Sequence, residues 1–199
     1  MNKKVIIGII AAIVVVAAIV VAIIFLGKEK LQEITISLDI DYGEEIETAT
    51  ANIGYPQKPE IEFIDDTSSS KKFELKDKNC KLEVSLIELL ESVYDENKEA
   101  DKEKEGYKEI TFNGYKGYII KGEYRVEGYL LLADDESNIN KVLNFTVETI
   151  DSSKTNESEN LEALYNLKEV QTILKSVKYN GSKVVNKADN NTETTEVDK

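Results

Sequence analysis

The hydrophobic pattern opens with an uninterrupted apolar run near the N-terminus. Residues 5–27 lie between Lys4 and Lys28 and contain no charged or strongly polar side chain. As a helix, this run is long enough to cross the roughly 30 Å hydrocarbon core of a bilayer. It is also longer than the apolar core of a cleavable signal peptide, which spans about 7–15 residues. The run therefore predicts one uncleaved transmembrane helix.

A strand pattern begins soon after this run. Apolar and polar residues alternate at 34–40, which is typical of a half-buried strand. Residues 46–53 fit either a strand or a weak helix. Shorter extended patterns at 60–63, 73–75 and 82–84 predict further strands.

The hydrophobic period changes at residue 86. Leu86, Leu89, Leu90 and Val93 follow the spacing of an amphipathic helix. We therefore expect a helix at 86–96 that packs on the sheet.

The segment 107–149 carries the clearest strand signal. Asn113 and Gly114 form the preferred two-residue hairpin turn, because both residues tolerate positive φ. The turn joins strand-like runs at 107–112 and 115–121, and further runs follow at 124–133 and 143–147. Together they predict a four-stranded antiparallel meander.

The last predicted element is a helix. Asn166 followed by Glu169 matches the capping pattern of a helix start. Leu167, Val170, Ile173, Leu174 and Val177 then form one apolar stripe. Asn180-Gly181 ends the helix, and the polar composition beyond it predicts disorder.

The positive charges around the apolar run indicate its orientation. Lys3 and Lys4 precede the run and Lys28 and Lys30 follow it, so the charge bias is slight, and the short N-terminus and long acidic C-terminal part favour an exported domain. We expect a single-pass protein of the cell membrane with a cytoplasmic N-terminus. Its parts would be the N-terminus at 1–4, the transmembrane helix at 5–27, an extracytoplasmic domain at 31–180 and a disordered tail at 181–199. The expected fold class is α+β, with an antiparallel sheet and packed helices after the transmembrane helix.

The order of these elements resembles the α/β/α sandwich of the Mog1/PsbP-like proteins. The resemblance rests on residues 114–118, Gly-Tyr-Lys-Gly-Tyr, and on the closing helix at 169–177. It covers about residues 33–179. The family shares no catalytic residues, so the resemblance implies a sandwich fold and a binding or accessory role.

Composition excludes several classes of function. The chain has a formal net charge of −13, which repels phosphate backbones and disfavours nucleic-acid binding. It contains no histidine, so Ser-His-Asp and Cys-His nucleophiles and imidazole metal sites are excluded. The acidic run 39–45 lacks the third acidic ligand of a calcium loop. We therefore expect no cofactor and no metal site.

Cys80 is the single cysteine, so an intramolecular disulfide is excluded. It lies in the alternating run 80–84, which predicts that it points inward as a small apolar residue.

Tyrosine gathers in the predicted meander, together with the only arginine. Both side chains bury a large area and keep a polar end, which favours binding surfaces. The candidate binding residues are Tyr115, Tyr118, Tyr124, Arg125 and Tyr129. Strand propensity alone also accounts for the clustering, so both interpretations stay open.

Three functions are compatible with these observations. The first is a non-catalytic, membrane-anchored extracytoplasmic module that binds a protein or an envelope component. The second is an extracytoplasmic hydrolase that acts on a glycan through carboxylates, although 38 acidic residues make any chosen pair uninformative. The third is a membrane-tethered spacer. The lack of histidine and of a cofactor motif favours the binding module over the enzyme.

Overall fold

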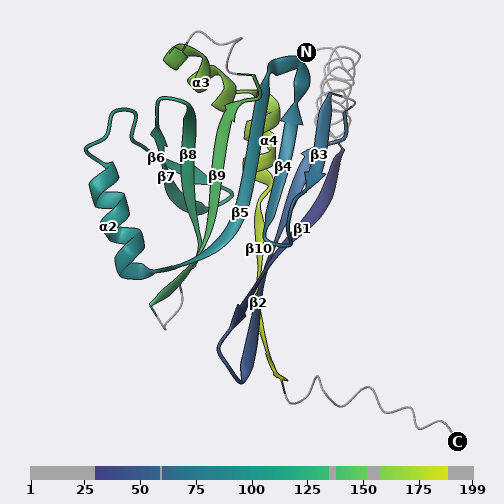
Figure 1. The fold of residues 1–199 in the computed structure, drawn as a ribbon, viewed down its shortest axis with the longest axis vertical. Coiled ribbons are helices and arrows are strands. Elements are labelled where there is room, and N and C mark those ends of the chain that lie inside the picture. The colour runs from purple at the N-terminus through teal and green to yellow at the C-terminus, as the bar shows by residue number, and fades with distance from the viewer. Residues whose placement is uncertain (1–29, 59, 135–137, 152–156, 188–199) are drawn as a thin grey trace, which may run out of the picture. The chain divides into compact units, whose positions relative to one another are not determined.

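Antiparallel strands in two sheets make up most of the described chain (Figure 1). The computed structural model describes residues 30–58, 60–134, 138–151 and 157–187. The chain divides into two units, residues 1–31 and 32–199, and the second unit contains nearly all of the described residues.

The smaller sheet has the strand order β1 (Leu31–Asp41), β2 (Glu45–Pro56) and β10 (Lys178–Asn186). The larger sheet has seven strands in the order β3 (Ile61–Asp65), β4 (Ser70–Leu75), β5 (Cys80–Leu90), β9 (Ile139–Thr149), β8 (Arg125–Asp134), β7 (Tyr115–Lys121) and β6 (Lys108–Phe112). A short 3-10 helix, η1 (Lys76–Lys78), joins β4 to β5.

The main core lies on the inner face of the larger sheet. Alternate residues of β5, such as Leu82 and Val84, have no exposed area and point into this core. Two short helices supply more of it: α3 (Glu157–Tyr165) packs on β8 and β9, and α4 (Lys168–Ser176) packs on β2. Because α4 carries an apolar stripe, it joins the smaller sheet to the same core.

A second, smaller cluster lies on the outer face of the larger sheet. There α2 (Glu91–Asp101) contacts β5 and β9. Tyr94 of this helix packs with Tyr118 and Val142 of the sheet. Part of the sheet is therefore buried on both faces.

The predicted fold class is wrong in two respects. Strands dominate the described part, and its helices have 11, 9 and 9 residues. At 1.5 Å per residue the longest of these reaches about 16 Å, well short of the roughly 30 Å of a bilayer core. Within the described ranges no helix is long and apolar enough to cross a membrane, which contradicts the predicted single-pass transmembrane architecture. The segment 5–27, on which that prediction fell, lies outside the described residues.

The helix predicted at 86–96 is also wrong at its start. Leu86–Leu90 continue β5, paired with β9 as far as Leu90 opposite Ile139, and α2 begins only at Glu91. Leu86 points into the main core, whereas Ile87 and Leu89 pack in the outer cluster. Because this part of β5 has apolar packing partners on each face, its inward and outward residues are both apolar, and their spacing matches that of a helix.

The meander is confirmed. Strands β6, β7, β8 and β9 pair antiparallel in sequence order. Asn113 and Gly114 form the hairpin turn between β6 and β7 with φ of 50° and 89°. The ambiguous residues 46–53 belong to strand β2.

The C-terminal elements differ from their predicted boundaries. The closing helix is present as α4, but Leu167 occupies its N-cap position and makes no side-chain capping hydrogen bond, so the predicted Asn166 cap is wrong. The boundary expected at 180/181 falls inside β10, where Gly181 has a φ of 96° at a register shift against β2. The rest of the predicted tail, from residue 188, lies outside the described residues.

Candidate binding surface

The outward residues of β5, β8 and β9 change character along the strands. At one end they are apolar, as Ile87, Leu131 and Val142 are, and they pack in the cluster beside α2. At the other end they are polar and half-buried or exposed. This second region, the polar outer face, also takes in β4 and comprises Glu74, Lys81, Glu83, Ser85, Arg125, Glu127, Tyr129, Asn144, Thr146 and Glu148.

Tyr118 lies at the centre of a group of tyrosine rings beside this face. Its ring centroid is 5.1 Å from that of Tyr129, 5.7 Å from that of Tyr107 and 5.9 Å from that of Tyr94. Tyr118 has no exposed area, so it supports its neighbours and does not present a surface. Stacked rings hold each other in one orientation, which makes Tyr129 a rigid part of the sheet surface.

The structure brings together only some of the five residues predicted to bind. Tyr118 and Tyr129 are stacked, and Arg125 lies on the same strand as Tyr129. Tyr115 faces the opposite side, where its hydroxyl accepts a hydrogen bond of 2.9 Å from the amide of Tyr179. Tyr124 is 72% exposed in the turn before β8. The alternation of strand β7 separates Tyr115 from Tyr118, because residues three apart point to opposite faces.

Arg125, Glu127 and Tyr129 form a hydrogen-bonded chain along β8. The Arg125 guanidinium lies 3.0 Å from one carboxylate oxygen of Glu127, and the Tyr129 hydroxyl donates to the other oxygen at 2.5 Å. Burial raises the pKa of Tyr129, and the Glu127 carboxylate raises it further. The hydroxyl therefore stays protonated and acts as a hydrogen-bond donor near neutral pH.

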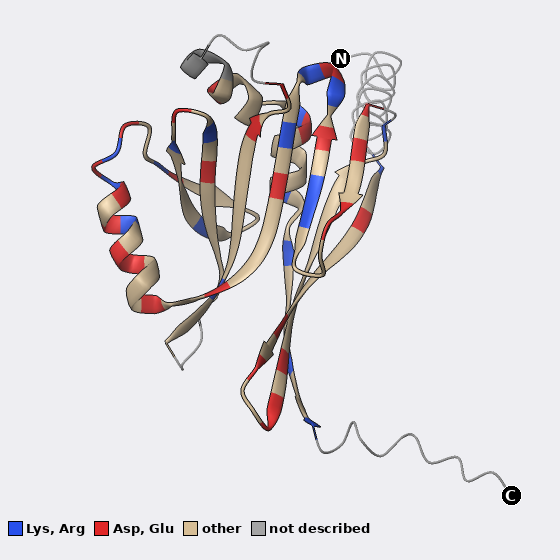
Figure 2. Ribbon diagram, in the orientation of Figure 1, with Lys and Arg blue, Asp and Glu red and all other residues tan. Residues whose placement is uncertain are grey.

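The polar outer face also carries a ladder of alternating charges across four strands. Glu74 faces Lys81, Lys81 faces Glu148, and Glu148 faces Arg125 in the strand register. Lys81 and Glu148 form an ion pair. Figure 2 shows basic and acidic residues close together on β4 and β5. Alternation predicts that these side chains point outward, but only the strand pairing places them opposite one another.

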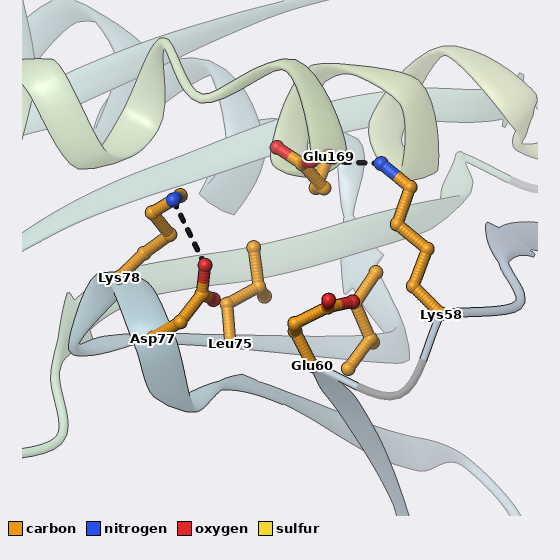
Figure 3. A pocket seen from close by; sticks show the side chains of 7 residues that line it. Lys58, Glu60, Leu75, Asp77, Lys78 and Glu169 are labelled. Carbon is orange, nitrogen blue, oxygen red and sulfur yellow. Dashed lines mark hydrogen bonds and ion pairs between the residues drawn. The ribbon is translucent and has the colours of Figure 1, made fainter.

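A pocket of about 290 Å³ lies between η1 and the start of α4 (Figure 3). The Lys58 ammonium lies 3.0 Å from Glu169, and the Lys78 ammonium lies 2.8 Å from Asp77. The hydrogen bond from Lys58 holds the pKa of Glu169 below its ordinary value. An ionic ligand would have to displace one of these pairs, which makes the pocket a weaker candidate than the polar outer face.

A partly buried ionic cluster connects the two sheets. The Lys141 ammonium of β9 lies 2.8 Å from Glu88 of β5 and 3.2 Å from Glu47 of β2, and the Tyr42 hydroxyl lies 3.3 Å from both carboxylates. Lys141 is only 2% exposed. Each of the three charged residues continues the inward row of its strand, so alternation could have marked each one as inward-facing, although only the tertiary structure brings them together. We interpret it as a structural link between the sheets.

Cys80 points inward as predicted and has no exposed area. Burial raises the pKa of its thiol to about 12, with a further contribution from the Glu169 carboxylate. We expect Cys80 not to react with Ellman's reagent in the native protein, because the reactive thiolate is disfavoured. When the protein is unfolded in guanidinium, Cys80 should react fully, and the reagent should release one equivalent of its coloured product per chain. Complete reaction at the same rate in both states would contradict this assignment.

Comparisons with protein-family models, with curated proteins and with solved structures find no match for this chain. The resemblance to the Mog1/PsbP-like proteins therefore stays a prediction.

Proposed function

We propose that this protein is a non-catalytic binding module that docks a protein partner on the polar outer face. The observation that carries the proposal is the chain of Arg125, Glu127 and Tyr129, fixed on the buried ring of Tyr118. Arginine and tyrosine are the residue types that most often dominate binding energy at interfaces. Their fixed geometry lowers the entropy lost on association.

The charge pattern supports a protein as the partner. Glu74, Lys81, Glu148 and Arg125 alternate in sign across the strands, so this row of the face presents both signs of charge. Such a pattern is complementary to another surface that carries both signs, as folded proteins do. The acidic chain as a whole repels a polyanion such as a nucleic acid.

The hydrolase alternative has less support. It requires two carboxyl groups that face each other across a cleft. In the pocket of Figure 3 the carboxylates of Asp77 and Glu169 instead face the ammonium groups of Lys78 and Lys58. Each of these carboxylates thus pairs with an ammonium group and not with a second carboxylate, as an acid–base pair would require.

Site-specific photocrosslinking tests the proposed surface. A photoreactive amino acid replaces Thr146 at the centre of the polar outer face, and a matched control replaces Lys183, an exposed residue of β10 in the other sheet. We expect a discrete crosslinked protein from position 146 and a clearly weaker one from position 183. Adding Arg125→Ala should reduce the crosslink at 146 about tenfold, which corresponds to roughly 1.4 kcal/mol.

Three outcomes would count against this surface: equal crosslinks at both positions, a stronger product at position 183, or no effect of Arg125→Ala.

In parallel, labelling intact cells with a membrane-impermeant amine reagent tests the extracytoplasmic location expected from the sequence. Lysines labelled only after lysis would contradict that location without affecting the surface assignment.

A further inference from the structure

A second pocket, of about 230 Å³, opens on the inner side of the larger sheet beside the end of α3. Its apolar lining comes from Ile119, Val126 and Tyr165, which are 7%, 2% and 6% exposed. These three side chains belong to the main core, so the pocket has a rigid apolar floor. It lies on the face of β7 and β8 opposite to the polar outer face.

Two lysines line the pocket beside this apolar floor. Lys108 is the register partner of Ile119, and Lys121 is the register partner of Val126. Register partners in antiparallel strands present their side chains on the same face, so both lysines line the pocket beside the apolar residues.

These lysines differ from others in the described part of the chain in that no described carboxylate neutralises their charge. Many lysines of the structure lie against a carboxylate, as Lys58 and Lys78 do in the pocket of Figure 3. Within the ranges that the structure describes, neither Lys108 nor Lys121 forms an ion pair. Among the described residues, Glu162 is the one carboxylate residue that lines the same pocket. Two ammonium groups against one carboxylate make this a locally basic site in an acidic protein.

Gly106 forms one wall of the pocket and approaches Lys121 closely. Its φ is +79°, and a Cβ atom added there would lie 2.5 Å from the Cβ of Lys121. Only glycine combines this backbone conformation with so close an approach. The loop before β6 is thereby held against β7, which fixes the opening of the pocket.

We propose that this pocket binds a small organic carboxylate with an aromatic or short branched body. The body would lie on Ile119, Val126 and Tyr165, and the carboxylate would lie between the ammonium groups of Lys108 and Lys121. The pocket is smaller than the roughly 300–1,000 Å³ of sites for drug-sized ligands, which limits the ligand to about one ring. Apolar walls with a few placed charges are the usual composition of a small-molecule site. The site is independent of the proposed docking surface.

The test compares three probes on the full chain by isothermal titration calorimetry: benzoate, benzyl alcohol and acetate. Benzyl alcohol keeps the ring without the charge, and acetate keeps the charge without the ring. We expect benzoate to bind with a Kd on the order of 1 mM, and each of the other probes to bind about tenfold more weakly. In methyl NMR spectra, benzoate should shift the resonances of Ile119 and Val126.

Charge-matched double variants locate the site. Lys108→Gln with Lys121→Gln should weaken benzoate binding about tenfold, whereas Lys178→Gln with Lys183→Gln, two exposed residues of β10, should leave it unchanged. Undetectable benzoate binding would overturn the proposal, and so would equal binding of benzyl alcohol. Unchanged binding by the Lys108 and Lys121 variant would also overturn it. The comparison of probes uses the unmodified protein, so it holds even if a variant folds poorly.

Discussion

Replacing Lys141 by alanine is expected to lower the free energy of unfolding by about 3–5 kcal/mol, because two carboxylates lose their shared buried cation. Lys141 is 2% exposed and lies within 3.2 Å of both Glu47 and Glu88. Without the ammonium group, these carboxylates remain close together at the inner side of the two sheets. Removing one partner of a buried ionic group costs far more than the intact group contributes in net stability.

The same cluster sets a pH dependence whose direction follows from two pKa shifts. Burial acts to raise the pKa of Glu47, but hydrogen bonds from Ser182 and Lys141 outweigh it, and the pKa lies below its ordinary value of 4.5. The contribution of Glu47 to the free energy of unfolding is therefore fully present above pH 4.5. It is lost as the pH falls through the lowered pKa of Glu47 in the folded state.

Lys141 contributes in the opposite direction. Burial acts to lower its pKa, but hydrogen bonds to Glu88 and Glu47 outweigh burial, so the pKa lies above 10.5. The contribution of Lys141 to the free energy of unfolding is fully present below pH 10.5. It is lost as the pH rises through the raised pKa of Lys141 in the folded state.

Urea unfolding of the full chain at several pH values measures both effects. A triple variant, Lys141→Met with Glu47→Leu and Glu88→Leu, should recover most of the stability, because it removes the whole ionic group and not one member. Lys183→Met, at an exposed position of β10, is the matched control and should change stability by less than about 0.5 kcal/mol. A loss below about 1 kcal/mol for Lys141→Ala would show that solvent reaches the cluster and screens it.

The second large effect is expected at Phe145, whose ring lies over Gly128. Gly128 is the register partner of Phe145, and a Cβ atom added to it would lie 2.1 Å from Cζ of that ring. The ring has no exposed area and stacks on Tyr165 of α3 at a centroid distance of 6.4 Å. Phe145→Ala should cost about 3–5 kcal/mol through the cavity that it leaves. Gly128→Ala should cost about 1–3 kcal/mol through overpacking.

A double-mutant cycle tests whether these two residues share one volume. In the combined variant the new methyl group enters space that the ring has vacated, so the total cost should be smaller than the sum by about 1 kcal/mol. Thr146→Ala, at the outward position beside Phe145, is the control and should stay within about 0.5 kcal/mol. Strict additivity of the two costs would contradict the direct contact.

Several elements could be predicted from local sequence patterns alone. The Asn113-Gly114 turn follows from the tolerance of these residues for positive φ, and it defines the register between β6 and β7. The inward position of Cys80 follows from the two-residue period of a strand. The stripe of α4 follows from the helical period, and Val170, Ile173 and Leu174 are buried as that stripe requires. Each depends on neighbours within a few residues.

The same period could have divided the tyrosines correctly. Tyr115 and Tyr118 are three residues apart on one strand, so they had to point to opposite faces. The sequence could not show that α2 approaches Tyr118 and removes it from solvent, because that contact depends on the path of a separate element. Of the five candidate binding residues, Arg125 and Tyr129 therefore remain as the centre of the proposed surface.

Tertiary structure alone decided the elements whose partners are distant in sequence. Residues 86–90 belong to a strand because β9 pairs with them, with Leu86 packed in the main core and Ile87 and Leu89 in the outer cluster, although their spacing favours a helix. Strand β10 is polar along most of its length, and it is ordered by its pairing with β2, more than a hundred residues earlier. The Lys141 cluster likewise joins residues of β2, β5 and β9. By itself the sequence determined the local period and the hairpin turn, whereas strand partners and double-sided burial depend on the free energy of long-range pairing, which no local pattern contains.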